Sequence, residues 1–343
     1  MVSWRPYYVS TFSGIEAATV AWAPLGWVPV CFSEIDPFPS AVLEERFPSV
    51  PNLGDITKID WSDLSGFVDV VVGGSPCQSF SVAGRREGLE GESGLMWEYV
   101  RAVRELRPEW LLWENVPGAL SSSHGEDFRC LLESLDALGY GLAWRVLDAQ
   151  FFGVAQRRER VFLVGRLGDV EGPCEVLFES ESLSWGAQSS REKREALAAG
   201  AGRSPASAGF SYKTGAGAGT IGYAEECGPT IASARADAAV LCMGDTASKE
   251  SVDEDMCGTL QERNSKEPPI VACGEVRRLT PRECERLMGF LDDWTKVPYR
   301  GKTADQCSDT PRYKAIGNSM AVPVMAWIGK RIQEVMDREE TEE

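Results

Sequence analysis

The chain has 343 residues, of which 43% are hydrophobic and 25% are charged. These values are typical of a globular protein with one large domain or two moderate ones. No apolar run reaches the length of a membrane span, and the start of the chain lacks the apolar stretch of a secretory signal. We therefore expect a cytoplasmic protein with no membrane partner.

The net charge of −17 disfavours a uniformly basic nucleic-acid-binding surface. The charge is unevenly distributed, however, because residues 274–331 contain eleven Lys or Arg against seven Asp or Glu. A locally positive face on an acidic body would bind DNA with a steep salt dependence. The acidic tail at 337–343 is expected to be frayed.

The ten cysteines form no C-x-x-C pair, and the chain has a single histidine, His124. Zinc sites need closely spaced thiolates and imidazoles, so we expect no metal. The polar, turn-like surroundings of His124 predict a solvated loop residue.

The first elements are a strand at 7–12, a turn and a helix at 17–22, followed by a strand at 28–34 that ends in an acid. Glu34 comes twenty residues after Gly14. In dinucleotide-type folds an acid at about this spacing hydrogen-bonds a ribose hydroxyl. The turn lacks the Gly-x-Gly-x-x-Gly pattern of a pyrophosphate cradle, which favours S-adenosylmethionine over NAD.

A helix is predicted at 38–47, and Asp55 then lies near the end of another strand, as a ligand contact or as the cap of a turn. The apolar run 68–72 predicts a buried strand of a parallel sheet, which leads into Gly-Gly-Ser-Pro-Cys-Gln at 73–78. Ligands bind at the carboxyl ends of such strands, so we interpret Cys77 as a nucleophile. Most of the other cysteines are interpreted as small buried hydrophobes.

A polar, glycine-rich loop at 83–94 precedes a helix at 96–106 and a strand at 110–113. Glu114 follows that strand directly, at the sheet edge where Cys77 is expected. It is either a solvated strand end or a carboxyl group in a pocket. A helix at 128–138 and a strand at 143–147 come next.

Gln-Arg-Arg-Glu-Arg at 156–160 is a polar cluster between apolar runs, and a strand is predicted at 161–165. From 171 to 273 glycine, alanine, serine and charged residues dominate, with a faint repeat that predicts paired β-elements ending near 242 and 273. A helix capped by Thr280 and Gly289 follows, and an apolar-faced helix is predicted at 321–336.

These segments resemble, in the family's order, the motifs of the DNA (cytosine-5)-methyltransferases: Gly-Ser-Pro-Cys-Gln-Ser-Phe-Ser at 74–81, Glu-Asn-Val at 114–116, Gln-x-Arg-x-Arg at 156–160 and Gly-Asn-Ser at 317–319. The resemblance implies a Rossmann-like α/β sheet that binds S-adenosylmethionine, with a smaller, irregular target recognition domain. It divides the chain into a catalytic domain at 1–172, a target recognition domain at 173–310 and a returning segment at 311–343.

The same resemblance implies roles for individual residues. The catalytic residues are Cys77, Glu114, Arg158 and Arg160. The cofactor contacts are Phe12, Ser13, Gly14, Ile15, Glu34, Ile35, Asp55, Ile56, Gly74, Pro76, Asn318 and Ser319. The DNA contacts are Gln78, Ser81, Arg85, Arg86 and Gln156. The family's first motif has glycine where this chain has Glu16, whose carboxylate would point away, bind the cofactor's ammonium or weaken cofactor binding.

The resemblance implies methyl transfer to C5 of a flipped cytosine in double-stranded DNA, through a covalent adduct with Cys77. We expect a monomer of a prokaryotic or phage-infected cell, with a cognate restriction endonuclease as partner if it serves a restriction system. The alternatives are a transfer-RNA cytosine-5 methyltransferase and an inactive DNA-binding regulator on the same fold. An NAD-linked enzyme is disfavoured by the missing glycine fingerprint.

Overall fold

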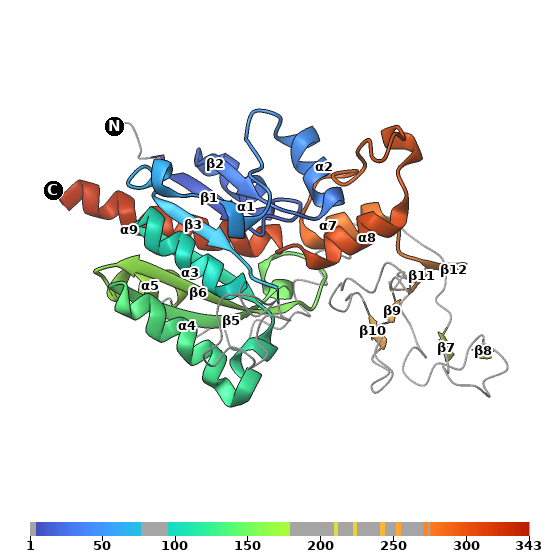
Figure 1. Cartoon of the computed structure of the whole chain (residues 1–343). Helices are drawn as coiled ribbons and strands as arrows, with labels where there is room; N and C mark the ends of the chain where they lie inside the picture. Colours follow the sequence, from blue (N-terminus) through green and yellow to red (C-terminus); the bar gives the residue numbers. More distant parts are fainter. Residues whose placement is uncertain are drawn as a thin grey trace.

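The computed structural model describes residues 5–76, 95–178 and 275–342, together with five short strands within 209–273. Its centre is a six-stranded sheet in the order β2-β1-β3-β4-β6-β5 (Figure 1). The strands are β1 (Tyr7–Thr11), β2 (Val28–Ser33), β3 (Val70–Gly73), β4 (Trp110–Asn115), β5 (Tyr140–Asp148) and β6 (Glu159–Leu167). The first four pair in parallel, whereas β6 is antiparallel to both β4 and β5.

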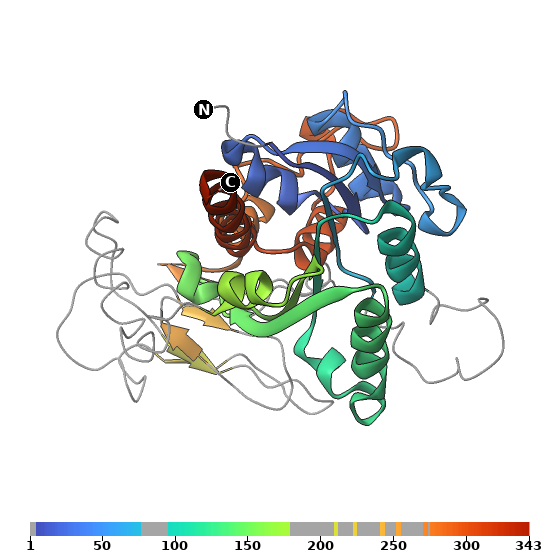
Figure 2. The ribbon, with the colours of Figure 1, turned by 90° about the vertical axis from the view of Figure 1, so that its left-hand side faces the viewer.

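Helices cover both faces of this sheet (Figure 2). They are α1 (Ala17–Trp22), α2 (Pro37–Arg46), α3 (Leu95–Leu106), α4 (Glu126–Ala137), α5 (Glu171–Leu177), α7 (Pro281–Met288), α8 (Asp309–Asn318) and α9 (Val322–Glu342). Helices α1, α5 and α9 pack on one face, and α3 and α4 pack on the other.

Burial on both faces explains why the central strands are continuous apolar runs rather than alternating ones. In β3, Val70 and Val72 face the α9 side, whereas Val71 faces the α3 side. The strand predicted at 68–72 is therefore confirmed as a buried strand with parallel neighbours on both sides.

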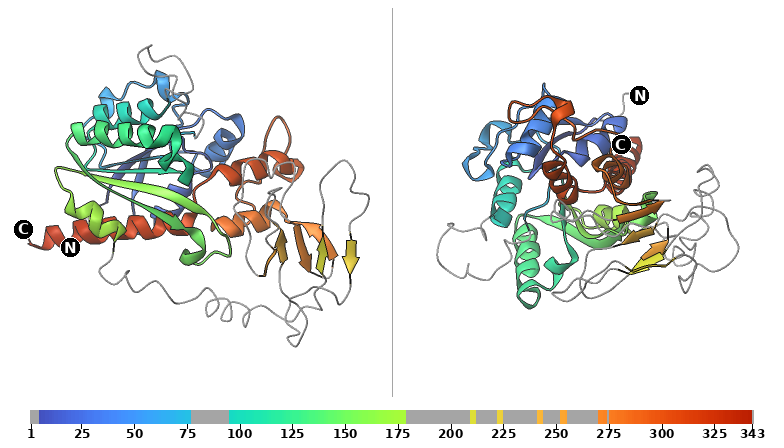
Figure 3. Two further views of the ribbon diagram at one scale, coloured as in Figure 1. Left: turned by 90° about the horizontal axis from the view of Figure 1, so that it is seen from below. Right: turned by 90° about the vertical axis from the view of Figure 1, so that its right-hand side faces the viewer.

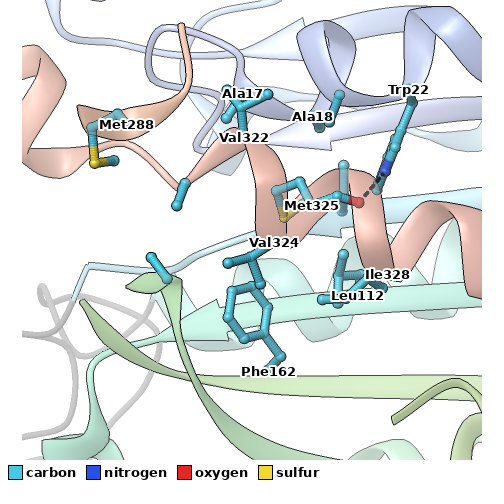
Figure 4. Packing of buried hydrophobic residues seen from close by; sticks show 14 of the residues in the cluster. Ala17, Ala18, Trp22, Leu112, Phe162, Met288, Val322, Val324, Met325 and Ile328 are labelled. Atoms are coloured by element: carbon cyan, nitrogen blue, oxygen red, sulfur yellow. Dashed lines mark hydrogen bonds between the residues drawn. The ribbon is translucent and has the colours of Figure 1, made fainter. Parts of the chain in front are cut away.

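Helix α9 closes the core from the other end of the sequence. Its Ile328 lies near Leu112 of the sheet, and the indole Nε1 of Trp22 in α1 donates a hydrogen bond to the carbonyl oxygen of Met325 at 2.8 Å (Figure 4). Gly329 makes this approach possible, because a Cβ at that position would lie 2.3 Å from the same Nε1.

The acidic tail was expected to be frayed, but it is helical, because α9 continues to Glu342. Ion pairs hold its last turns: Arg166 pairs with Glu339 at 2.5 Å, and Arg338 pairs with Glu175 at 2.6 Å. These contacts join residues far apart in the sequence, so local composition does not reveal them.

A second sheet, in the order β10-β9-β11-β12, lies at the end of the molecule opposite the C-terminus (Figure 3). It contains β9 (Leu241–Met243), β10 (Val252–Glu254), β11 (Ile270–Cys273) and β12 (Glu275–Arg278), and a separate pair is formed by β7 (Gly209–Ser211) and β8 (Gly222–Ala224). β9 and β11 pair antiparallel, which agrees with the paired β-elements expected from the repeat.

Two parts of the predicted recognition domain pack instead with the large sheet. Val176 and Leu177 of α5 are buried in its core. Near the other end of that predicted domain, the indole Nε1 of Trp294 donates a hydrogen bond to the carbonyl oxygen of Ile15 at 3.0 Å. Met288 of α7 is buried in the same core as α5. Residues on both sides of the positions 172 and 310 therefore share one core.

Candidate active site

A cavity of about 900 Å³ opens where β1, β2, β3 and β4 end. This is the crevice in which open α/β sheets bind ligands. The segment after each of these strands contributes to its wall, and α8 supplies the opposite side. The lining includes Phe12 and Gly14, Glu34 to Asp36, Asp55 and Ile56, Gly74 to Pro76, Glu114 to Val116, Arg158, Arg160, Gly317 and Asn318.

One half of the cavity is built around Gly14 and Glu34. Gly14 has a left-handed φ of +56°, and no atom lies within 4 Å of the place where a Cβ would be. Glu34 Oε2 accepts a hydrogen bond from the Gly14 amide at 2.8 Å, and Oε1 accepts one from the Asp36 amide at 2.7 Å. Each carboxylate oxygen has a further lone pair, which a ribose hydroxyl can use. Burial raises the pKa of Glu34.

Asp55 and Ile56 complete this half. Asp55 Oδ1 accepts a hydrogen bond from the Thr57 amide at 3.1 Å and so caps the short 3-10 helix Ile56–Lys58. Its pKa is lowered by the hydrogen bond and ion pair with Lys58. Asp55 thus caps a turn and also lines the cavity, so the two interpretations offered by the sequence are compatible. Ile35 also lines the cavity, and this residue is 67% exposed, so it presents apolar surface there.

The other half is built around Glu114 at the end of β4. Arg160 Nε lies 3.2 Å from Glu114 Oε1, and their side chains are only 13% and 12% exposed. Burial raises the pKa of Glu114, and the positive charges of Arg160 and Arg158 oppose this effect. Gly74 allows the close contact between β3 and β4, because a Cβ there would lie 2.9 Å from the Glu114 carbonyl oxygen and 3.1 Å from Oε2.

Trp113 and Asn115, for which the sequence predicts no role in the site, hold Ser75, two residues before Cys77. The Asn115 side chain donates from Nδ2 to the carbonyl oxygen of Ser75 at 2.9 Å, and Trp113 Nε1 donates to Ser75 Oγ at 3.3 Å. Asn115 and Ser75 are both buried. The only sequence signal was the place of Asn115 in the Glu-Asn-Val motif and of Ser75 between two glycines and a proline.

The structure separates the two arginines. Arg158 is buried and donates from Nη2 to the carbonyl oxygens of Gly317 at 3.2 Å and Ser319 at 2.6 Å, so it holds the returning segment against the site. Burial lowers the pKa of Arg158 to about 9. Arg160 instead pairs directly with Glu114 in the wall of the cavity. Nothing in the Gln-x-Arg-x-Arg pattern distinguishes the two arginines in this way.

Not every expected site residue reaches the cavity. Ile15 is buried in the core, Ser13 bridges β1 and β2 through hydrogen bonds, and Ser319 contributes its carbonyl oxygen to Arg158. None of the three is among the lining residues. Gln156, expected at the DNA, is fully buried. Cys77, Gln78, Ser81, Arg85 and Arg86 lie outside the described residues.

Glu16 points away from the cavity. Its carboxylate accepts hydrogen bonds from Ser10 Oγ at 2.8 Å and from both the amide and the hydroxyl of Thr19 at 3.0 Å. It caps α1 in a left-handed conformation with φ 63°, a conformation that favours glycine. The side chain is almost completely buried, which raises its pKa to about 7.

His124 is exposed in a turn, in agreement with its predicted role as a loop residue. Within the described ranges, no group of three or more metal-ligating side chains is arranged to hold an ion. The helices of the same ranges include none with the length and apolarity needed to cross a membrane.

Comparison with known proteins agrees with this geometry. The model of the family "C-5 cytosine-specific DNA methylase" matches residues 7–215 and 221–334. A protein of Escherichia phage P1 named DNA N-6-adenine-methyltransferase is 33% identical over 97% of this chain, which spans only 62% of that protein's length. Type II methyltransferase M2.BsuMI of Bacillus subtilis (strain 168) is 31% identical to this chain, and the match covers 95% of this chain and 75% of the length of M2.BsuMI.

Solved structures share the fold at low identity. Schizosaccharomyces (S. pombe) Dnmt2 methyltransferase superposes with a TM-score of 0.63 at 17% identity, over 97% of this chain and all of the other. A putative DNA modification methyltransferase from an E. coli prophage gives a TM-score of 0.62 at 20% identity, covering 97% and 99%. With the family model spanning nearly the whole sequence, the chain belongs to the C-5 cytosine-specific DNA methylase family.

Proposed function

We propose that this chain transfers a methyl group from S-adenosylmethionine to C5 of a cytosine flipped out of duplex DNA. The observation that carries the proposal is the buried pair of Glu114 and Arg160, which shares one cavity with Glu34 and with Pro76, the residue before Cys77. A nucleophile, a base-binding carboxyl group and a ribose-binding carboxyl group would then act within one enclosure.

The cavity suits this pair of ligands. Its volume of about 900 Å³ lies toward the upper end of the usual range for ligand sites. A base stacked in a duplex cannot expose C5 and C6 to protein groups, so it must leave the helix, at a cost of a few kcal/mol. The Glu114 end of the cavity would receive it.

S-adenosylmethionine, the methyl donor of this family, supplies the methyl group as a sulfonium electrophile. Glu34 would bind the ribose hydroxyls, and Ile35 and Ile56 would enclose the adenine with apolar surface. The open space at Gly14 leaves room for the ligand to approach the backbone. Asn318, on the far wall, would bound the methionine end.

The covalent step would begin with attack of the Cys77 thiolate on C6, which moves the ring π electrons toward C5 and N3. Glu114 would hold a proton at N3, and its raised pKa favours this protonated form. Arg160 would fix the Glu114 carboxyl and present its remaining donors to the base. Formation of the bond between C5 and the methyl carbon would break the bond from that carbon to the sulfonium sulfur, and S-adenosylhomocysteine would leave. Transfer of the C5 proton to water and breakage of the sulfur–C6 bond would then release 5-methylcytosine and the thiolate.

The name of the phage P1 relative raises adenine N6 methylation as a second candidate. An exocyclic amine is methylated by direct attack on the sulfonium, so it needs no cysteine adduct. The placement of Cys77 in the sequence after the buried strand β3, with Glu114 at the end of β4, therefore favours cytosine. We retain transfer RNA as an alternative substrate in the test below.

The test is mass spectrometry of nucleosides after incubation of purified protein and S-adenosylmethionine with genomic DNA or with transfer RNA. We expect 5-methylcytosine in the DNA, none with Cys77→Ser, and a reduced rate with Glu114→Gln. Cofactor binding by Cys77→Ser should remain close to normal. Formation of N6-methyladenine alone, modification of RNA alone, or full activity of Cys77→Ser would contradict the proposal.

For the domain organisation, we propose that residues 179–278 supply target recognition, while α5 and residues 279–308 belong to the catalytic unit. The burial of Val176, Met288 and Trp294 in the main core supports this division. We further propose that the chain acts as a monomer on double-stranded DNA in a bacterial or phage-infected cell, beside a restriction endonuclease where one is encoded.

A further inference from the structure

A tight hairpin at residues 299–302 forms part of the cavity rim. Tyr299 and Lys302 exchange backbone hydrogen bonds of 3.1 Å in both directions, which leaves Arg300 and Gly301 as the two turn residues. Arg300 and Lys302 are exposed and also line the cavity. They therefore stand where the cavity meets the solvent.

The hairpin is fixed in place from below. The Tyr299 ring packs edge-on against Phe38 of α2, with ring centroids 5.0 Å apart. An ion pair of 2.7 Å between Lys296 and Asp305 closes the base of the loop. The Arg300 guanidinium lies 5.2 Å from the centre of the Tyr299 ring, so the charged group itself is supported by this aromatic ring. The two cations are thus presented from a firm base.

The backbone of Arg300 has a left-handed conformation that is unfavourable for an arginine. Both turn residues are left-handed, with φ 50° at Arg300 and φ 74° at Gly301. A two-residue hairpin of this kind prefers asparagine, aspartate or glycine at its first position. A side chain that folding alone would not select at a strained position points to a role in binding.

The acids nearest to the hairpin in the sequence already have other cationic partners. Asp305 is paired with Lys296, and Asp309 lies 3.6 Å from Arg312. Asp36, which caps α2, is paired with Lys314 at 3.0 Å. Within the described residues neither Arg300 nor Lys302 forms an ion pair with a carboxylate. They are excess positive charge on a protein whose net charge is −17.

We propose that Arg300 and Lys302 bind the phosphate backbone of the DNA strand that delivers the flipped cytosine. This inference rests on the proposed function, because a flipped nucleotide in the cavity keeps its flanking phosphates at the rim. S-adenosylmethionine does not match two cations, since it has one carboxylate beside two cationic groups and so carries net positive charge, whereas a nucleotide strand presents one anionic phosphate after another. Phosphate contacts of this kind position the duplex without reading its sequence.

The test is binding of a fluorescent duplex of arbitrary sequence at 50 to 200 mM salt. The variants are Arg300→Asn, Lys302→Ala and their combination, with Lys330→Ala as the control, because Lys330 is an exposed lysine on α9. Arg300→Asn installs a residue that the turn prefers, so its thermal stability should be equal to or higher than that of the wild type. Each hairpin substitution should lower the slope of log K against log salt by about 0.9, and the combination by about twice that.

At 0.1 M salt this corresponds to an affinity loss of about tenfold for each cation removed. The Kd for S-adenosylmethionine, measured without DNA, should not change. An unchanged salt slope, a slope change of equal size in Lys330→Ala, or a loss of cofactor affinity alone would overturn the proposal. Because binding needs no turnover, a chain that shows the slope change but forms no 5-methylcytosine would refute the proposed function and leave the phosphate contact standing.

Discussion

The buried carboxyl group of Glu16 should make the free energy of unfolding depend on pH. Its folded-state pKa is raised from 4.5 to about 7 by burial, against three opposing hydrogen bonds from Ser10 and Thr19. The neutral form therefore stabilises the fold below pH 4.5, and this stabilisation is lost as the pH rises to about 7. At about 1.4 kcal/mol for each pKa unit, the difference between 4.5 and about 7 corresponds to about 3 kcal/mol.

Glu16→Gln removes the titration and keeps most of the hydrogen bonds. The amide oxygen can accept from the Thr19 amide and hydroxyl as Oε1 does, and the amide nitrogen can donate to Ser10 Oγ. We expect the variant to be close to the wild type at pH 4.5 and to gain about 3 kcal/mol of unfolding free energy relative to it by pH 8.

The assay is urea unfolding of both proteins at half-unit steps between pH 4.5 and 8. Ionisations elsewhere are common to the two proteins, so the difference between their unfolding free energies isolates residue 16. A difference that stays constant over this range would refute the assignment of a buried, neutral carboxyl group at low pH.

Three substitutions test the geometry of the site. Gly74→Ala should push Glu114 from its position and lower kcat on the order of 10- to 100-fold, measured with saturating cofactor. Glu34→Gln should raise the Kd for S-adenosylmethionine by about tenfold or more, measured by calorimetry, because an amide nitrogen cannot accept a hydrogen bond. Gly329→Ala should lower the unfolding free energy by about 1–3 kcal/mol in urea, because its methyl group would meet the Trp22 indole.

Gly118→Ala is the control for the two glycine substitutions. A Cβ at Gly118 would lie 3.9 Å from Val116 Cγ2, an ordinary contact distance. Equal losses in Gly118→Ala and Gly74→Ala would contradict the claim that close contact with Glu114 matters. Normal cofactor affinity in Glu34→Gln would remove the proposed ribose contact, and an unchanged Gly329→Ala would show that α1 and α9 can separate without loss.

The central sheet and its binding edge could be predicted because their signals are local. Apolar runs such as 68–72 and 110–113 mark strands buried on both faces, and the polar residue after each run is placed at the sheet edge. The helix with caps at Thr280 and Gly289 could be predicted in the same way, and in α7 both caps are present, with a capping box between Thr280 and Glu283. The same signals place Glu34 and Glu114 at the binding edge of the sheet from the sequence alone.

Other features depend on contacts between distant segments. The antiparallel insertion of β6 between β4 and β5 leaves no mark on the apolar pattern of 161–165. The hydrogen bond from Trp294 to the carbonyl oxygen of Ile15 and the ion pair between Arg166 and Glu339 each join residues far apart in the sequence. The division of work between Arg158 and Arg160 likewise depends on which carbonyl oxygens the returning segment presents.

The proposed mechanism depends on a covalent bond between Cys77 and C6 of cytosine. Duplex DNA with every cytosine replaced by 5-fluorocytosine tests it without knowledge of the target sequence, because fluorine at C5 blocks the elimination that would release the enzyme. With S-adenosylmethionine present, we expect a protein–DNA adduct that peptide mass spectrometry assigns to Cys77 and that Cys77→Ser does not form. An adduct at another residue, or no adduct from a preparation that makes 5-methylcytosine in ordinary DNA, would contradict it.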